Sequence, residues 1–180
     1  MKGGAEGEID RRLCALGERF AVPTAGARSL RVLLALLAED PTAPTTVTDP
    51  CEGIDAHLAD ALVALELPAF RAARTLVDLG AGPGVPGLPL AAALPGARVY
   101  LVESVGRKAS FLAGAVDAMG LGNVEVVWGR VETWAAGRGV CDVVCARALA
   151  RLDVVVEYAA PLLRDGGQLV AWKGRRDAEE

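Results

Sequence analysis

The chain has 180 residues, of which 52% are hydrophobic and only 4% are aromatic, so it can bury one core built mainly from Ala, Val and Leu. Its formal net charge of −4 excludes a protein that coats nucleic acid through bulk positive charge, but it leaves room for a local basic face. The N-terminal residues contain no apolar signal segment, and no apolar run approaches membrane-spanning length. We therefore expect a cytoplasmic protein with no membrane partner.

The first part of the chain is expected to be helical. Residues 7–20 and 28–39 show amphipathic periodicity and are separated by Pro23. The turn-rich stretch PTAPTTVTDP follows, and its three prolines exclude regular structure there. Helical periodicity resumes over residues 52–66. We predict that residues 1–72 form a helical segment that packs on the domain after it.

From Arg74 the pattern changes to short β-rich runs that alternate with helical stretches. The predicted strands are TLVDL (75–79), RVYLVE (98–103), VEVVW (124–128), CDVVCA (141–146) and GQLVAWK (167–173). Helices are predicted at 86–94, 106–119, 131–136 and 151–163. This alternation is typical of βαβ units, so residues 73–180 are expected to form an α/β domain with five parallel strands and right-handed crossovers.

A glycine-rich loop follows the first predicted strand. Its residues Gly82-Pro83-Gly84-Val85-Pro86-Gly87 match the pattern G-x-G-x-x-G, which occurs in dinucleotide-binding enzymes but is weak alone. In a doubly wound sheet, this loop lies where ligands bind, and the glycines at 80, 82 and 84 let the backbone approach a ligand closely. The loop therefore predicts a nucleoside cofactor without choosing one.

Asp78 favours one cofactor over another, because it lies two residues before Gly80. A carboxylate there would repel a pyrophosphate by about 1–4 kcal/mol and would attract the sulfonium and ammonium groups of S-adenosylmethionine. Pro83 and Pro86 remove two N–H donors from the loop, which makes it a poor anion site. These features favour S-adenosylmethionine over NAD. The alternative for Asp78 is a solvated strand end or a helix cap.

Glu103 closes the second predicted strand, 23 residues after Gly80. A carboxylate at this position can accept hydrogen bonds from both ribose hydroxyls of a nucleoside. It supports a nucleoside cofactor without distinguishing S-adenosylmethionine from a dinucleotide, and the alternatives are again a solvated strand end or a helix N-cap.

Five segments taken together are more specific for one protein family than the glycine loop alone: VDLGAGPGVPGLPLA, LVESVGRKASFL, NVEVVWGRVETWA, DVVCARALA and LVAWKG. In these segments the chain resembles the RsmG/GidB family, bacterial methyltransferases that modify guanine N7 in 16S ribosomal RNA. The resemblance covers residues 45–174 and includes HLADAL at 57–62. It implies a Rossmann-like, class I S-adenosylmethionine-dependent methyltransferase fold.

The resemblance also implies roles for individual residues. It implies that Gly80, Val85, Val131, Glu132 and Arg147 bind the cofactor. Asp78, Gly82 and Glu103, which the loop and the strand ends already indicate, complete the expected cofactor-binding residues. Val131 and Glu132 would lie against the adenine, and Arg147 would face the substrate from the end of the fourth strand. Guanine N7 carries no proton, so methyl transfer to it needs no general base and no catalytic residue is expected. His57 is the single histidine and is expected to make a packed hydrogen bond.

The partner implied by the resemblance is 16S ribosomal RNA, free or in the assembling small subunit. Candidate RNA-contacting cations are Arg107, Lys108, Arg147, Arg151, Lys173, Arg175 and Arg176, and we hypothesise that the last three contact phosphate. The four cysteines match no zinc spacing, so we expect buried free thiols and no metal. A full-length chain is expected to be a monomer.

The sequence departs from the family in two places. The segment EDPTAPTTVTDP lacks the Trp-Asn pair and the basic residues that many members carry there, so RNA contact by this segment is not expected. Members usually continue past WKG with a helix and two more strands. We therefore expect the sheet to lack this C-terminal strand pair, which would leave the fifth strand as an exposed edge and lower the stability of the chain.

Three further functions stay open on the sequence. A methyltransferase acting on a small molecule would use the same sheet, but it predicts an apolar lid that the sequence does not contain. The second is an inactive fragment that binds only the cofactor. The third is a nucleotide-binding oxidoreductase, which Asp78 and the two loop prolines disfavour.

Overall fold

The computed structural model describes the backbone of residues 2–173 and the side chains from residue 6 onward. The N-terminal elements are α1 (Lys2–Phe20), α2 (Thr24–Glu39), α3 (Pro50–Gly53), η1 (Ile54–Ala59), α4 (Asp60–Leu62), η2 (Val63–Glu66) and α5 (Pro68–Ala72). They are followed by β1 (Thr75–Leu79), α6 (Gly87–Ala93), β2 (Arg98–Glu103), α7 (Gly106–Met119) and β3 (Val124–Trp128). The last elements are η3 (Val131–Thr133), η4 (Ala135–Gly137), β4 (Cys141–Arg147), α8 (Leu152–Ala159) and β5 (Leu163–Trp172).

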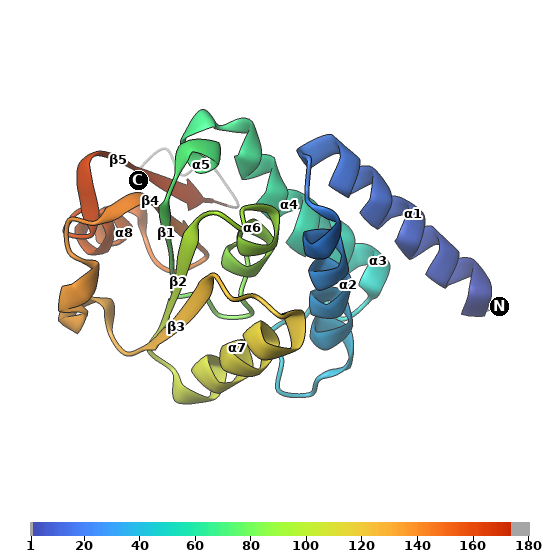
Figure 1. Cartoon of the computed structure of the whole chain (residues 1–180). Coiled ribbons are helices and arrows are strands. Elements are labelled where there is room, and N and C mark those ends of the chain that lie inside the picture. The colour runs from blue at the N-terminus through green and yellow to red at the C-terminus, as the bar shows by residue number, and fades with distance from the viewer. Residues whose placement is uncertain (1, 174–180) are drawn as a thin grey trace.

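The five strands form one parallel sheet in the order β3-β2-β1-β4-β5 (Figure 1). The prediction of a parallel α/β sheet is confirmed. The chain runs outward from β1 through β2 to β3 and then returns to the other side of β1 with β4. The carboxyl ends of β1 and β4 therefore mark a topological switch point, which is where ligands bind in open α/β sheets. Within residues 2–173, β5 pairs only with β4 and forms one edge of the sheet.

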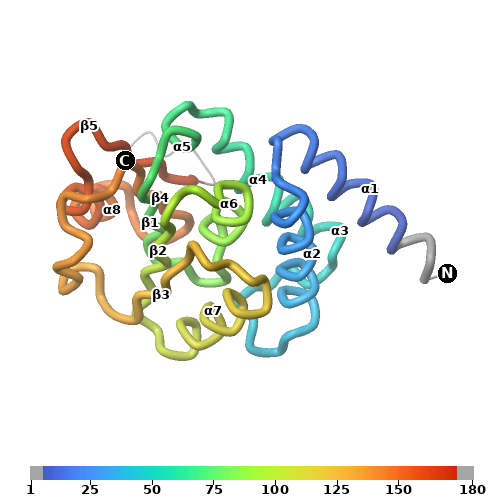
Figure 2. Tube along the Cα trace, viewed as in Figure 1, coloured from blue at the N-terminus to red at the C-terminus, as the bar shows by residue number. Residues whose placement is uncertain are grey.

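Helices cover both faces of the sheet. On one face α6 and α7 pack against the strands, α2 packs on these two helices, and α1 packs on α2. The trace in Figure 2 shows α1, in blue, as the helix farthest from the strands. On the other face, Val155 and Ala159 of α8 join Val77 and Leu79 of β1 in a second apolar cluster. Residues 75–79 alternate between the two faces, and residues 76–79 are all buried, so the strand is apolar on both sides apart from Thr75 and Asp78.

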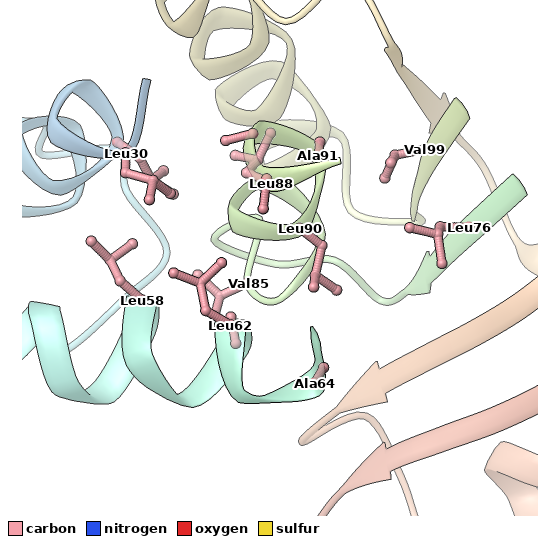
Figure 3. Close-up of a cluster of buried hydrophobic side chains, with 14 of the residues drawn as sticks. Leu30, Leu58, Leu62, Ala64, Leu76, Val85, Leu88, Leu90, Ala91 and Val99 are labelled. Carbon is pink, nitrogen blue, oxygen red and sulfur yellow. The ribbon is translucent and has the colours of Figure 1, made fainter. Parts of the chain in front are cut away.

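The larger core lies around α6, between the sheet and the N-terminal helices. Figure 3 shows Leu88 and Leu90 of α6 lying between Leu62 of α4 and Leu76 of β1. All four side chains are fully buried, with at most 1% of their surface exposed. The N-terminal helices and the strands thus share one continuous core, which holds α6, and the loop before it, in a fixed position.

Most predicted elements are confirmed, with some differences at their ends. The strands 75–79, 98–103 and 124–128 have the predicted bounds, whereas β5 begins at Leu163 because a register irregularity between β4 and β5 extends the pairing. The predicted helix over 52–66 contains a π-helical and a 3₁₀ turn. The short helix α5 was not predicted, although Pro68 at its first position is a typical start signal.

The four cysteines are free thiols. Cys141 and Cys145 are buried as predicted, and burial raises the pKa of the Cys141 thiol to about 12. The prediction was wrong for Cys14, which is exposed on α1, and for Cys51, which is half-buried.

Candidate functional site

The glycine loop, residues 80–86, leaves the carboxyl end of β1 at the switch point. Gly80, Gly82 and Gly84 have φ values of +66°, +53° and +85°, which side-chain-bearing residues rarely adopt. The backbone N–H of Gly80 donates to the carbonyl of Val102 at 2.9 Å, so the loop begins by turning over the end of β2. The glycines are thus required by the loop's own backbone as well as by any ligand.

Two buried carboxylates hold the loop by accepting hydrogen bonds from its backbone and from the first residue of α6. Asp78 Oδ2 accepts a hydrogen bond from the N–H of Gly87 at 2.8 Å, and Glu103 Oε2 accepts one from the N–H of Gly82 at 3.0 Å. The other oxygen of Glu103 accepts from the N–H of Val105 at 2.8 Å. Asp78 and Glu103 are only 1% and 4% exposed. Together they fix both ends of the loop against the first turn of α6 and the end of β2.

This arrangement revises the expectation for Asp78. Its carboxylate lies beneath the loop and does not line either of the two cavities described below. Burial raises the pKa of Asp78 to about 7, against the opposing effects of the Gly87 N–H and the Arg147 guanidinium, which lower it. A carboxylate with this pKa is only partly ionised at neutral pH. The expected full negative charge facing the ligand is thus replaced by a buried, partly ionised carboxyl. Pro83 and Pro86, which remove N–H donors from the loop, therefore become the stronger reason to disfavour a pyrophosphate.

A first cavity, cavity A, of about 240 Å³ opens on the α8 side of the loop. It is lined by Leu79, Gly80, Val102, Ser104, Gly129, Arg130, Val131, Glu132, Leu149, Ala150, Val154 and Tyr158. The predicted residues Gly80, Val131 and Glu132 are therefore brought together, from β1 and from the η3 turn after β3. Glu132 is exposed and pairs with Arg130, with Arg130 Nη2 at 2.7 Å from its Oε1. This ion pair lowers the pKa of Glu132.

A second cavity, cavity B, of about 530 Å³ lies on the other side of Gly80. It is lined by Ala43, Pro44, Thr45, Thr46, Val47, His57, Gly80, Ala81, Pro83, Val85, Arg107, Lys108, Arg147 and Ala148. The predicted residues Val85 and Arg147 line this cavity and not cavity A. Gly80 lines both cavities, and a Cβ on Gly80 would lie 2.5 Å from Leu149 Cδ1. Leu149, which lines cavity A, thus packs against Gly80, the lining residue that the two cavities share.

Arg147 and His57 each bring an unsatisfied polar atom to this region. Arg147 Nη1 lies 3.2 Å from Asp60 Oδ2, but it is buried and forms no hydrogen bond of acceptable geometry within the described residues. The His57 ring contacts Thr45 Oγ1 through Nε2 at 3.1 Å, which confirms the predicted packed hydrogen bond. Its Nδ1 is buried without a partner among the described residues. Burial, and secondarily Arg147, lowers the pKa of His57.

The predicted RNA-contacting cations separate into three groups. Arg107, Lys108 and Arg147 line cavity B. Arg151 is exposed at the start of α8 and pairs with Asp153 at 3.4 Å, and Lys173 Nζ donates to the carbonyl of Ala150 at 3.4 Å. Arg175 and Arg176 lie outside the described residues.

Sequence reasoning missed several residues of this site. Leu149, Tyr158, Ser104 and Thr45 were not singled out, although they line the cavities. Of these four residues, only Leu149 could have been suspected from the sequence, because it lies in the ALA segment directly after Arg147. Thr45 reaches cavity B from a segment that the sequence marked only as irregular.

The described part of the chain contains neither a metal-binding cluster nor a membrane-spanning helix. No group of three or more His, Cys, Asp or Glu side chains within it is arranged to hold a metal ion. Among the helices of residues 2–173, none combines the length and the apolar content that crossing a bilayer requires.

Comparison with known proteins identifies the family. The model of the GidB family, described as rRNA small subunit methyltransferase G, matches residues 34–180. The chain belongs to the GidB family. Among its GidB relatives, "Ribosomal RNA small subunit methyltransferase G" of Rubrobacter xylanophilus is 48% identical over 121 residues, which cover 66% of this chain and 46% of the relative. The protein of the same name from Methylococcus capsulatus is 43% identical over 136 residues, covering 76% and 64%. This GidB chain thus spans about half to two thirds of the length of these relatives.

Solved structures support the fold. A methyltransferase from Geobacter sulfurreducens matches with a TM-score of 0.54 at 18% identity, covering 78% of this chain and 69% of that one. The precorrin-6y C5,15-methyltransferase of Geobacter metallireducens matches with a TM-score of 0.53 at 16% identity, covering 66% and 65%. The GidB chain therefore has the class I methyltransferase fold, as predicted.

Proposed function

We propose that this chain is an S-adenosylmethionine-dependent methyltransferase that methylates guanine N7 in 16S ribosomal RNA. The observation that carries the proposal is that two cavities share the lining residue Gly80, at the switch point of the sheet of a GidB-family chain. One cavity suits a cofactor and the other, lined by three cations, suits an anionic substrate. The names of the curated relatives supply the substrate class.

The residues around cavity A suit an adenosyl group. The walls formed by Leu79, Val102 and Val154 are apolar and would pack on a purine, while the polar groups of Ser104 and Glu132 stand at the same cavity. Gly80 presents bare backbone to both cavities, and a Cβ there would enter the space that Leu149 already occupies. The cofactor would therefore be held with its adenosyl part in cavity A and its methionyl part beside Gly80. When bound, S-adenosylmethionine supplies an electrophilic methyl group on its sulfonium.

Cavity B supplies the groups that would orient a guanine. Arg147 lines cavity B, where its buried Nη1 lies 3.2 Å from Asp60 Oδ2 without a hydrogen bond of acceptable geometry. Guanine O6 is an acceptor that arginine commonly contacts, and a contact with O6 would leave the N7 lone pair free. Guanine N7 carries a lone pair and no proton, so the chain needs to align the base and to exclude water, not to remove a proton. In well-aligned systems, proximity and orientation can lower the activation free energy by about 7–11 kcal/mol.

The proposal extends to the partner and the organisation of the chain. The substrate is 16S ribosomal RNA, free or in the assembling small subunit, and the protein acts as a monomer in the cytoplasm. We assign residues 73–180 to the cofactor-binding domain and residues 1–72 to a helical segment that supports it. The described residues of both parts share one apolar core, which supports this division.

Two measurements test the proposal. Titration calorimetry with S-adenosylhomocysteine and with NAD should show binding of the first and not of the second. Incubation with S-adenosylmethionine and 16S ribosomal RNA or small subunits that lack the modification should give 7-methylguanosine, located by mass mapping. Binding without methylguanosine in either RNA substrate would contradict the substrate assignment, and NAD binding would contradict the cofactor assignment.

A variant links this activity to the geometry. Arg147→Gln should reduce methylation more than it reduces S-adenosylhomocysteine affinity, because Arg147 lines cavity B and not cavity A. The matched control is Arg28→Gln on α2, an exposed arginine outside both cavity linings. Equal losses of affinity and activity in Arg147→Gln would contradict the separation of the two cavities.

A further inference from the structure

We propose that the indole of Trp128, together with Arg107 and Lys108, forms a platform on which an unpaired RNA base stacks next to cavity B. The inference rests on the proposed function and adds Trp128 as a substrate contact to the cations Arg107 and Lys108, which the sequence already suggested. Trp128 is 73% exposed, the highest exposed fraction among the large apolar side chains of the described residues.

The three tryptophans differ in their surroundings. Trp134 packs on Tyr100 with ring centroids 5.1 Å apart, and Trp172 packs edge-on to Phe70 at 6.3 Å and donates its Nε1–H to the carbonyl of Asp60. Trp128 makes neither a ring contact nor a side-chain hydrogen bond with any residue in the described range. Its ring is therefore an aromatic surface available to an external partner.

The backbone holds Trp128 in a defined place. It ends β3, pairs in register with Glu103 at the end of β2, and is followed by the N–H of Gly129, which donates to the Glu103 carbonyl at 3.0 Å. One side of the ring lies against Gly106, where an added Cβ would be 3.2 Å from Trp128 Cζ2. Glycine at this position thus lets the indole rest on the start of α7 while most of its surface stays in solvent.

Two cations follow in the chain the residue on which the ring rests. Arg107 and Lys108 follow Gly106 in the first turn of α7, and both line cavity B. Within residues 2–173 neither forms an ion pair, whereas Arg98 at the start of β2 and Arg130 after β3 are paired with Glu125 and Glu132. In a chain with a net charge of −4, these two cations beside an exposed indole favour an anionic partner.

The chemistry of this surface selects single-stranded RNA. Proteins bind unpaired nucleic acid by stacking bases on aromatic rings and by placing cations along the phosphates. Val105, which is 41% exposed and directly precedes Gly106 in the chain, adds exposed apolar surface to this segment. A nucleotide chain whose target base occupies cavity B would pass Lys108 and Arg107 and reach Trp128 with a neighbouring base. A purely apolar protein partner would leave the two cations without counter-charges.

The first test measures RNA affinity with the 180-residue chain. Fluorescence anisotropy with a labelled, unstructured ten-nucleotide RNA should show that Trp128→Ala weakens binding roughly tenfold, as expected for one lost stacking contact. Trp128→Phe should retain most of the affinity, because it keeps an aromatic face. The matched control Leu67→Ala removes a 44%-exposed apolar side chain before α5, and it should bind RNA as the wild type does. Wild-type affinity in Trp128→Ala would overturn the proposal.

A second test examines the cations and separates this inference from the proposed function. The double variant Arg107→Gln/Lys108→Gln should make the slope of log K against log salt shallower by about 1.4, since each phosphate contact with a single strand contributes about 0.7. An unchanged slope would overturn the role of the two cations. S-adenosylhomocysteine affinity should be unchanged in Trp128→Ala, because Trp128 does not line cavity A. If the wild type binds no S-adenosylhomocysteine but Trp128→Ala still loses RNA affinity, the proposed function fails and the platform stands.

Discussion

The carboxylate of Asp78 accepts a hydrogen bond from the backbone N–H of Gly87 at 2.8 Å, across the whole length of the glycine loop. This contact joins the end of β1 to the first residue of α6, and Glu103 makes the corresponding contact to Gly82. Both acids are buried, so their main role is to fix the loop that faces the two cavities. The loop is thus prearranged for a ligand before any ligand arrives, which reduces the ordering cost of binding.

The pKa of Asp78 makes the stability of the chain depend on pH. Because the folded-state pKa of about 7 exceeds the ordinary value of 3.8, the folded chain binds the proton more tightly, and stability falls as the pH rises from about 4 to about 7. The difference of about three units corresponds to an effect on the order of 4 kcal/mol. Asp78→Asn cannot ionise, so it should lose this pH dependence.

Urea denaturation of the wild type and of Asp78→Asn between pH 5 and pH 8 measures the effect. The free energy of unfolding of the variant, minus that of the wild type, should increase with pH and become constant above about pH 7.5. The other titratable groups are the same in both proteins, so their contributions cancel in this difference. Parallel curves at every pH would show that Asp78 has an ordinary pKa in the folded chain.

Gly87 donates its N–H hydrogen bond to the Asp78 carboxylate, and the close packing around Gly87 leaves no room for a side chain. A Cβ at this position would lie 2.3 Å from Leu101 Cδ2 and 2.8 Å from Asp78 Oδ2, in a fully packed environment. Gly87→Ala should therefore lower the free energy of unfolding by about 1–3 kcal/mol and weaken S-adenosylhomocysteine binding. Gly96→Ala is the matched control, because nothing lies within 4 Å of a Cβ there. Thermal melts and calorimetry of the two variants give the comparison, and similar behaviour of both would contradict the packing described here.

The bounds of the first three strands could be predicted from sequence because each is a short apolar run between turn residues. The alternation within β1 also places Asp78 on the same face as Leu76, the face that α6 covers. What the sequence could not provide is the meeting of the Asp78 carboxylate with the N–H of Gly87, because that contact depends on how the loop folds back. For this reason Asp78 was expected at the ligand and is found beneath the loop.

The walls of the cavities were predictable only in part. Val131 and Glu132 follow a strand directly, so strand order alone brings them to the carboxyl edge of the sheet. Leu149 reaches Gly80 because Ala148 adopts a φ of +51°, a conformation that no sequence pattern at this position indicated. Thr45 enters cavity B through a side-chain contact with His57, which joins two segments that have no shared periodicity.

The packing of α2 on α6 depends on another glycine. A Cβ on Gly26 would lie 2.1 Å from the carbonyl oxygen of Ala92, so the two helix backbones approach too closely for any side chain. Gly26→Ala should force the helices apart and cost about 1–3 kcal/mol of stability or more. Gly17 of α1 has nothing within 4 Å of its Cβ position, so Gly17→Ala should instead stabilise the chain by up to about 1 kcal/mol through helix propensity. Urea denaturation distinguishes these opposite signs, and destabilisation by Gly17→Ala would contradict the open surroundings of that residue.

His57 lines cavity B, so its pKa reports on the electrostatics of that cavity. It is the single histidine in the chain, so its titration can be followed without interference from other imidazoles. Burial, followed by the charge of Arg147, lowers its pKa below the ordinary value of 6.5. The folded chain thus binds this proton less readily than the unfolded chain, and the corresponding stability is lost as the pH falls below about 6.5. Arg147→Gln removes the second cause only, so it should raise the pKa of His57 without restoring the ordinary value.

NMR titration of the one imidazole measures this pKa directly in the wild type and in Arg147→Gln. Arg28→Gln, which removes an exposed arginine of α2, serves as the control and should leave the titration of His57 where it is in the wild type. The same midpoint in Arg147→Gln and in the wild type would mean that the guanidinium does not act on the ring. A wild-type midpoint at or above 6.5 would mean that the imidazole is not buried as described, and that cavity B is more open to water than the contact of His57 with Thr45 implies.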